Sequence, residues 1–187
     1  MGTGQKDCVL LVGLGNPGAV HVHSRHNVGQ FVLDVLARHL NLKWVNNRRL
    51  NADLARGHCD GGDFLLARPL AFMNASGYPV LRIVHYFHIA AENAVIVYDD
   101  LNLPLGSYKV THRVGSGGHL GMADVSEKLG ECTRFRIGIG PKRDPEMDLK
   151  DYVLDRFSDE EQAALFYAMP TILEGLQEIC LSGKTLA

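Results

Sequence analysis

The feature that most constrains the fold is a pair of short, uninterrupted apolar runs at residues 8–13 and 94–98. A strand with one face in water alternates apolar and polar residues, whereas a strand without that alternation is covered on both faces. Between the two runs, apolar residues recur at the spacing of one helix face, namely Val28, Phe31, Val32, Val35, Leu36 and Leu40. The sequence therefore predicts central parallel strands covered by helices.

The rest of the chain also divides into short strands and helices. Residues 51–58 and 63–68 predict a hairpin, because Asp60, Gly61 and Gly62 separate them. Further helices are predicted at 74–88, at 119–129 and from 158 to about 180, and further strands at 107–113 and 135–140. With 187 residues, 46% of them hydrophobic, one sizeable core is expected. We therefore predict a single three-layer α/β domain over residues 1–187, with a central mixed β-sheet flanked by helices and a flexible segment at 1–7.

Composition excludes several classes of protein. No stretch approaches the roughly 20 apolar residues that a membrane-spanning helix needs. The 4 cysteines are scattered without a C-x-x-C pair, which argues against a zinc knuckle and a disulfide framework. We expect reduced thiols and a cytoplasmic protein, with an organellar form left open.

Charge is unevenly distributed along the chain. The net charge is -2, yet residues 104–143 hold 7 Lys and Arg against 3 Asp and Glu, and residues 144–187 hold 3 against 10. A basic segment beside an acidic one can accommodate a polyanion on one face, although it can equally be a solvated surface.

The loop after the first apolar run has the pattern G-x-G-x-x-G, at Gly13, Gly15 and Gly18. A dinucleotide site would also need a helix that opens at the third glycine and an acidic residue about 20 residues further on. Residues 19–25 do not have a helical pattern, and the nearest acid lies inside the first predicted helix. We interpret the loop instead as one that presents Asn16 and His26 at the carboxyl end of a central strand, where open α/β sheets bind their ligands.

His26 is a candidate general base, because imidazole titrates near neutrality and a helix N-terminus disfavours its protonated form. A surface or helix-capping histidine is the alternative. Asp99 directly follows the second apolar run, so its carboxylate can accept a hydrogen bond from a histidine on a neighbouring loop, or can simply begin a turn. Asn74 could likewise cap a helix or bind a substrate carbonyl.

Two other chemistries are weaker. His21, His23 and His26 are spaced as H-x-H-x-x-H, but no carboxylate is obviously committed to them as a zinc ligand. Ser116, in a glycine-rich segment, lacks the G-x-S-x-G elbow of a serine hydrolase. That segment could bring backbone amides to a phosphate or an ester, or could be only a flexible turn.

Six blocks of sequence, taken together, resemble the bacterial-type peptidyl-tRNA hydrolase family. Their order and spacing agree from residue 9 to about 180. The blocks are GLGNPG at 13–18, SRHNVG at 24–29, FMNASG at 72–77, YDDLNLP at 98–104, GGH at 117–119 and RIGIG at 136–140.

The resemblance implies an esterase that cleaves peptide from tRNA, with water as nucleophile and no metal or other cofactor. It assigns His26 as the base, Asp99 as the group that orients it, and Asn16 as the side chain that distinguishes a peptidyl amide from a free amine. It further implies binding of the acceptor stem and 3′ end of tRNA, and we expect a monomer because of the size of the chain and the large surface that a tRNA would occupy. The residues it assigns to substrate or tRNA binding are His21, Phe72, Asn74, Lys109, Arg113, His119, Leu120 and Arg136, and further basic candidates are Arg134, Lys142 and Arg143.

Departures from the family pattern leave an alternative open. Leu120 stands where the family usually has asparagine, and loss of one such hydrogen bond costs about 0.5 to 3 kcal/mol, or up to roughly a hundredfold in rate. Thr111 replaces a basic residue, Ser24 a threonine and His21 a tyrosine. The alternative is a non-catalytic RNA-binding relative, such as a splicing or ribosome-associated factor.

Overall fold

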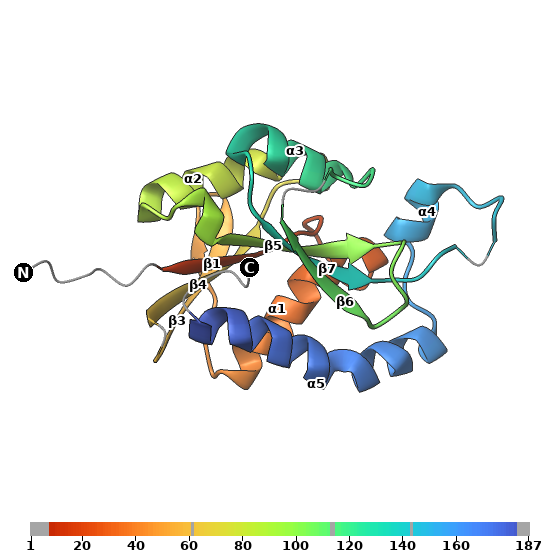
Figure 1. The fold of residues 1–187 in the computed structure, drawn as a ribbon. Helices are drawn as coiled ribbons and strands as arrows, with labels where there is room; N and C mark the ends of the chain where they lie inside the picture. Colours follow the sequence, from red (N-terminus) through yellow and green to blue (C-terminus); the bar gives the residue numbers. More distant parts are fainter. Residues whose placement is uncertain (1–7, 61, 113–114, 143, 183–187) are drawn as a thin grey trace, which may run out of the picture.

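The computed structural model describes residues 8–60, 62–112, 115–142 and 144–182. A single seven-stranded sheet has helices on both faces (Figure 1), which confirms the predicted mixed sheet. The expected flexible segment at 1–7 lies outside the described residues. The strands are β1 (Val9–Gly13), β2 (Val45–Asn47), β3 (Ala52–Cys59), β4 (Gly62–Pro69), β5 (Ala94–Asp100), β6 (Tyr108–His112) and β7 (Thr133–Gly138).

The strand order is β2-β3-β4-β1-β5-β7-β6. The four central strands are parallel, with β1 between β4 and β5, and β7 beyond β5. The edges are antiparallel, because β3 forms a hairpin with β4 and β6 pairs with β7. The two apolar runs thus form the adjacent central strands β1 and β5, as their lack of alternation predicted.

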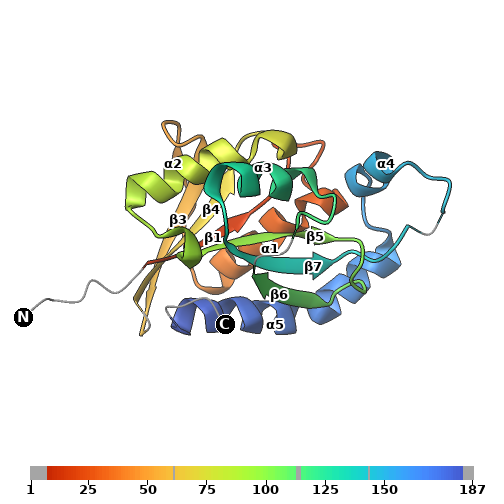
Figure 2. The ribbon, with the colours of Figure 1, turned by 45° about the horizontal axis from the view of Figure 1, so that its top comes forward.

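Two apolar layers cover the sheet. Helices α1 (Val28–His39) and α5 (Asp159–Ser182) pack on one face, and α2 (Gly77–Phe87) and α3 (Leu120–Leu129) on the other (Figures 1 and 2). A shorter helix, α4 (Leu149–Leu154), lies at the end of the sheet to which β5 and β7 point. Short 3-10 turns occupy η1 (Arg25–Asn27), η2 (Met73–Ala75) and η3 (Ala91–Asn93). Within the described residues, no helix combines the length and apolarity needed to span a membrane.

Two glycines bring α1 against the strand ends. A Cβ at Gly29 would lie 2.2 Å from the carbonyl oxygen of Val97 in β5, and one at Gly13 would lie 2.6 Å from the carbonyl oxygen of Gly29. Any larger side chain would push the helix away from the sheet. The close approach sets the residues just before α1 beside the end of β5.

Several predicted boundaries were wrong. The helix predicted at 74–88 is divided into η2 and α2, and the strand predicted at 135–140 runs from Thr133 to Gly138. The latter shift arises because the polar start of β7 is buried with internal partners. The Thr133 hydroxyl lies 2.9 Å from Nδ1 of His112, and the Arg134 guanidinium donates to the Gly115 carbonyl. Periodicity also missed the three-residue strand β2 and the six-residue helix α4, which are too short to show it.

Candidate active site

The loop after β1 is held by a side chain near its far end. Asn27 accepts the backbone N–H of Asn16 and donates to the Asn16 carbonyl, both at 2.9 Å. The first helical turn after β1 begins only at Arg25, well after Gly18. Residues 14–24 therefore provide no helix N-terminus for a pyrophosphate. The loop instead carries Asn16 and His26 to one pocket.

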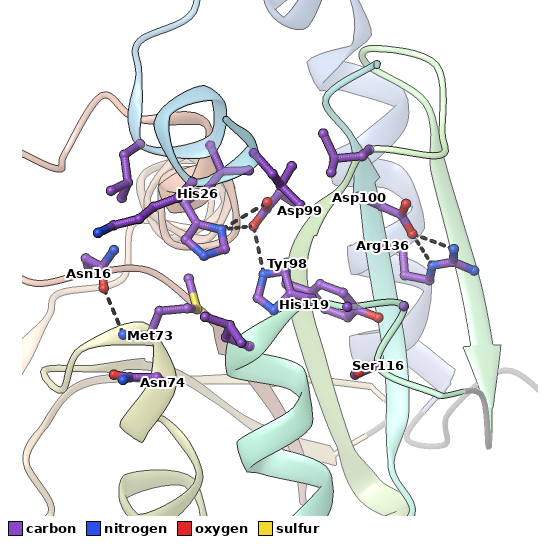
Figure 3. Close-up of a pocket in the computed structure, with 18 of the residues that line it drawn as sticks. Asn16, His26, Met73, Asn74, Tyr98, Asp99, Asp100, Ser116, His119 and Arg136 are labelled. Atoms are coloured by element: carbon purple, nitrogen blue, oxygen red, sulfur yellow. Dashed lines mark hydrogen bonds and ion pairs between the residues drawn. The ribbon is translucent and has the colours of Figure 1, made fainter. Parts of the chain in front are cut away.

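His26, Asp99 and His119 form a hydrogen-bonded chain (Figure 3). Nδ1 of His26 lies 2.9 and 3.0 Å from the two carboxylate oxygens of Asp99, and Nε2 of His119 lies 2.9 Å from Oδ1. His26 and Asp99 are buried and His119 is partly buried, and the two imidazole centroids are 4.8 Å apart. Asp99 is therefore shared by two histidines rather than one.

The hydrogen bonds determine where the imidazole protons lie. Nδ1 of His119, at the N-cap of α3, accepts the backbone N–H of Met122 at 3.0 Å. A neutral ring that accepts at Nδ1 carries its proton on Nε2, so His119 donates to Asp99. Because an ionised carboxylate only accepts, His26 also donates to it, from Nδ1. Nε2 of His26 keeps its lone pair, as a general base requires.

Asp99 is ionised in this arrangement. Burial alone would raise its pKa, but the partner histidines, first His119 and then His26, hold the pKa of Asp99 well below its usual range through their charge when protonated and through the hydrogen bonds that they donate. The carboxylate can therefore orient His26 across the physiological pH range.

The same three side chains could also be interpreted as a metal site, because their ligand atoms lie within 4.8 Å of one another. Nε2 of His119 could bind a metal only if its proton moved to Nδ1, where the N–H of Met122 already points. This donor arrangement favours a hydrogen-bonded network. His21 and His23 are not part of the cluster.

Asn16 is fixed in a defined orientation. Its Oδ1 accepts the backbone N–H of Met73 at 2.8 Å, so the amide nitrogen is on the other side. Among the described residues, no protein acceptor takes the Nδ2 protons. The buried Asn16 thus offers a donor to the pocket, while Asn74 on η2 is exposed there.

The pocket has a volume of about 790 Å³. It brings together eight of the predicted residues, namely Asn16, His26, Phe72, Asn74, Asp99, His119, Leu120 and Arg136. His21 and Lys109 are not among its lining residues, and Arg113 lies outside the described residues. Ser116 lines the pocket, but within the described chain no hydrogen bond joins its hydroxyl to either histidine.

The basic side chains that were predicted to contact tRNA phosphate differ in their burial and in the protein groups that they bind. Arg136 is paired with Asp100, to which its Nε donates at 2.5 Å, and Lys109 stands directly opposite Arg136 on β6. Arg134 is buried and bonded to Gly115 and Ser126, so the suggestion that it contacts phosphate was wrong. The Lys142 ammonium donates to two nearby carbonyls, and Arg143 lies outside the described residues.

The sequence did not reveal one wall of the pocket, which α4 provides. Arg25, the neighbour of His26, joins this region to the active-site loop. Its guanidinium donates to Glu161 at 2.7 Å and lies 4.4 Å from the ring centre of Tyr152 in α4. The sequence did contain one sign of α4, an aspartate at its N-cap. The Asp148 side chain accepts the backbone N–H of Lys150 at 2.7 Å.

Known proteins with a similar sequence and fold give this geometry a context. A family model described as Peptidyl-tRNA hydrolase matches residues 10–187. Proteins named peptidyl-tRNA hydrolase from Chloroflexus aurantiacus and Kineococcus radiotolerans are 38% and 35% identical to the chain. The first match covers 95% of both chains, and the second covers 95% of this chain and 93% of the relative.

The fold agrees with these sequence matches. The crystal structure of peptidyl-tRNA hydrolase from Acinetobacter baumannii has a TM-score of 0.86 and 30% identity, over 96% of this chain and 91% of that one. The family model, the relatives matched over most of their length and the fold all agree, so this chain is a member of the peptidyl-tRNA hydrolase family.

Proposed function

We propose that this protein hydrolyses the ester between a peptidyl, or N-blocked aminoacyl, group and tRNA. The observation that carries the proposal is the hydrogen bond between Nδ1 of His26 and Asp99, a carboxylate that a second histidine also binds beside a large pocket. This bond leaves Nε2 of His26 with a free lone pair. Membership of the family supports the choice of substrate.

In the proposed mechanism, Nε2 of His26 takes a proton from a water molecule as its oxygen attacks the ester carbonyl carbon. Asp99 stabilises the resulting imidazolium without taking the proton itself. As the tetrahedral intermediate collapses, the bond to the ribose oxygen breaks, and His26 returns the proton to that oxygen. The products are a peptide carboxylic acid, which loses its remaining proton to solvent, and a tRNA with an intact 3′ end.

Asn16 supports a preference for blocked amines. Its Nδ2 group can donate to the carbonyl of a peptide bond, whereas a free ammonium group, which also donates, gains nothing there. We propose that Asn74 and Phe72, on and next to η2, contact the first peptide unit and the acceptor end.

We predict that Asn16→Asp weakens this preference. The aspartate keeps an acceptor for the Met73 N–H but replaces the Nδ2 donor with an oxygen that repels a peptide carbonyl and attracts an ammonium group. We expect kcat/KM for N-acetyl-aminoacyl-tRNA to fall by about 10- to 100-fold, with a smaller loss for unblocked aminoacyl-tRNA. Equal losses on both substrates would refute the assigned role, and thermal unfolding serves as the folding control.

We further propose that Lys109 and Arg136 contact phosphates of the acceptor stem, giving affinity without sequence readout. His21, on the loop before η1, and Arg113 are candidates for additional tRNA contacts. Because a tRNA would cover much of the surface, we expect a monomer. A sedimentation mass near 20.6 kDa at all concentrations would support this expectation, and a concentration-dependent mass would contradict it.

The direct test of function is release of N-acetyl amino acid from N-acetyl-aminoacyl-tRNA by the purified chain. We expect repeated turnover, with the tRNA recovered intact and able to be recharged. Binding of tRNA without release above the rate in buffer would sink the proposal. The RNA-binding alternative is not favoured, because the cited relatives are named as hydrolases and the histidine and carboxylate are both retained.

A further inference from the structure

Three large apolar side chains are exposed around the pocket that contains His26. Phe72, Leu120 and Leu149 are 60%, 63% and 46% exposed, and all three line this cavity. They come from separate segments, at the N-cap of η2 and at the first residues of α3 and α4. Single exposed apolar residues are common, but their convergence on one concave site marks a surface that a ligand covers.

We infer that these three residues form an apolar subsite for the side chain of the amino acid whose ester is cleaved. The inference rests on the proposed function and adds a substrate preference to it. The preferred substrates are peptidyl-tRNAs whose last residue is large and apolar, such as leucine, methionine or phenylalanine.

The position of Leu120 supports this occupant. Leu120 directly follows His119, whose ring centre is 4.8 Å from that of His26 and whose Nε2 bonds the same carboxylate. Leu120 thus lines the same pocket as His26, next to a residue of its hydrogen-bonded network, and the reacting carbonyl must enter that pocket to reach the base. In an aminoacyl ester, the side chain branches from the carbon next to that carbonyl, so it is the part of the substrate that reaches this neighbourhood first.

The terminal base of the tRNA can contact Phe72, but it is a poorer candidate for the surface that the three residues form together. A base binds mainly by stacking on aromatic faces, whereas Leu120 and Leu149 are aliphatic and only Phe72 offers a ring. An aliphatic or aromatic amino acid side chain is complementary to all three. A charged side chain would instead lose hydration without gaining a partner from these residues.

The test compares N-acetyl-leucyl-, N-acetyl-glycyl- and N-acetyl-aspartyl-tRNA, prepared on tRNAs with matched acceptor stems. We expect kcat/KM for the leucyl substrate to exceed that for the glycyl and aspartyl substrates by about 10-fold or more. Leu120→Asn should reduce the ratio to below about threefold. Val45→Asn is the matched control and should keep the wild-type ratio, because Val45 is 64% exposed on the edge strand β2 and does not line the pocket.

Three results would overturn the subsite. The first is a ratio near one in the wild type, and the second is an unchanged ratio in Leu120→Asn. The third is a preference that follows the terminal base, when adenine is replaced by cytosine, instead of the amino acid. Each of these outcomes leaves ester hydrolysis intact, whereas failure of the proposed function would appear as no turnover of any substrate.

Discussion

His26→Ala is expected to lower kcat for N-acetyl-aminoacyl-tRNA by about 10²- to 10⁴-fold, the usual contribution of a positioned general base. The substitution removes the only ring nitrogen in the network that has a free lone pair, since Nδ1 of His119 accepts the Met122 N–H and its Nε2 donates to Asp99. Affinity for the tRNA should change little, because His26 is buried and bonded to protein. The measurement is single-turnover release of the N-acetyl amino acid at saturating enzyme.

The chain provides a matched control for this variant. His58 and Asp63 form another histidine–carboxylate pair, with Nδ1 and Oδ1 2.7 Å apart, but both are largely exposed on the β3–β4 hairpin. His58→Ala should therefore leave kcat unchanged. If His26→Ala retained wild-type turnover, another group would have to activate the water.

Asp99→Asn is expected to lower kcat by a comparable factor, about 10²- to 10⁴-fold, with little change in KM. The reason is the second histidine. His119 must keep its proton on Nε2, so the amide oxygen of the substituted side chain would take the place of Oδ1. The amide nitrogen would then take the place of Oδ2, 3.0 Å from Nδ1 of His26, and would donate to it. His26 would then accept at Nδ1 and carry its proton on Nε2, where it cannot accept a proton from water.

The ionised Asp99 should also make the free energy of unfolding depend on pH. Because the pKa of Asp99 is lowered in the folded state, its contribution to the free energy of unfolding is complete above the ordinary carboxyl pKa of about 3.9 and is lost as pH falls through the folded value. Wild type should therefore be more stable than Asp99→Asn near neutral pH, and this difference in the free energy of unfolding should narrow in acid.

The control for the effect of Asp99→Asn on turnover is Asp63→Asn, at an exposed carboxylate, which should match wild-type turnover. Normal turnover by Asp99→Asn would contradict the orienting role of Asp99.

The sequence was sufficient for the centre of the fold and for one pair of candidate site residues. Uninterrupted apolar runs identify β1 and β5, because only strands covered on both faces lack alternation. Asp99 lies near the carboxyl end of β5 and the loop that carries His26 follows β1, so their meeting at one end of the sheet follows from parallel pairing. The glycines at 13 and 29 allow that meeting by close contact, which no local pattern specifies.

Other parts of the site depend on contacts between distant segments. His119 was expected to touch substrate, and its bond to Asp99 arises only because α3 begins beside the end of β5. Its place at the start of the helix predicted over 119–129 was a signal for the N-cap role, but not for the carboxylate partner. The burial of Arg134 likewise depends on partners in the glycine-rich segment and α3, so charge alone misidentified it as a phosphate contact.

The central claim is that Asp99 leaves His26 with a bare Nε2, and ¹⁵N NMR of the histidine rings tests it most directly. At about pH 8, where free imidazole is neutral, the structure predicts that His26 carries its proton on Nδ1 and His119 carries its proton on Nε2. In Asp99→Asn, the proton of His26 should move to Nε2 while that of His119 stays in place. A wild-type His26 with its proton on Nε2 would contradict the account, because that nitrogen could not take a proton from water.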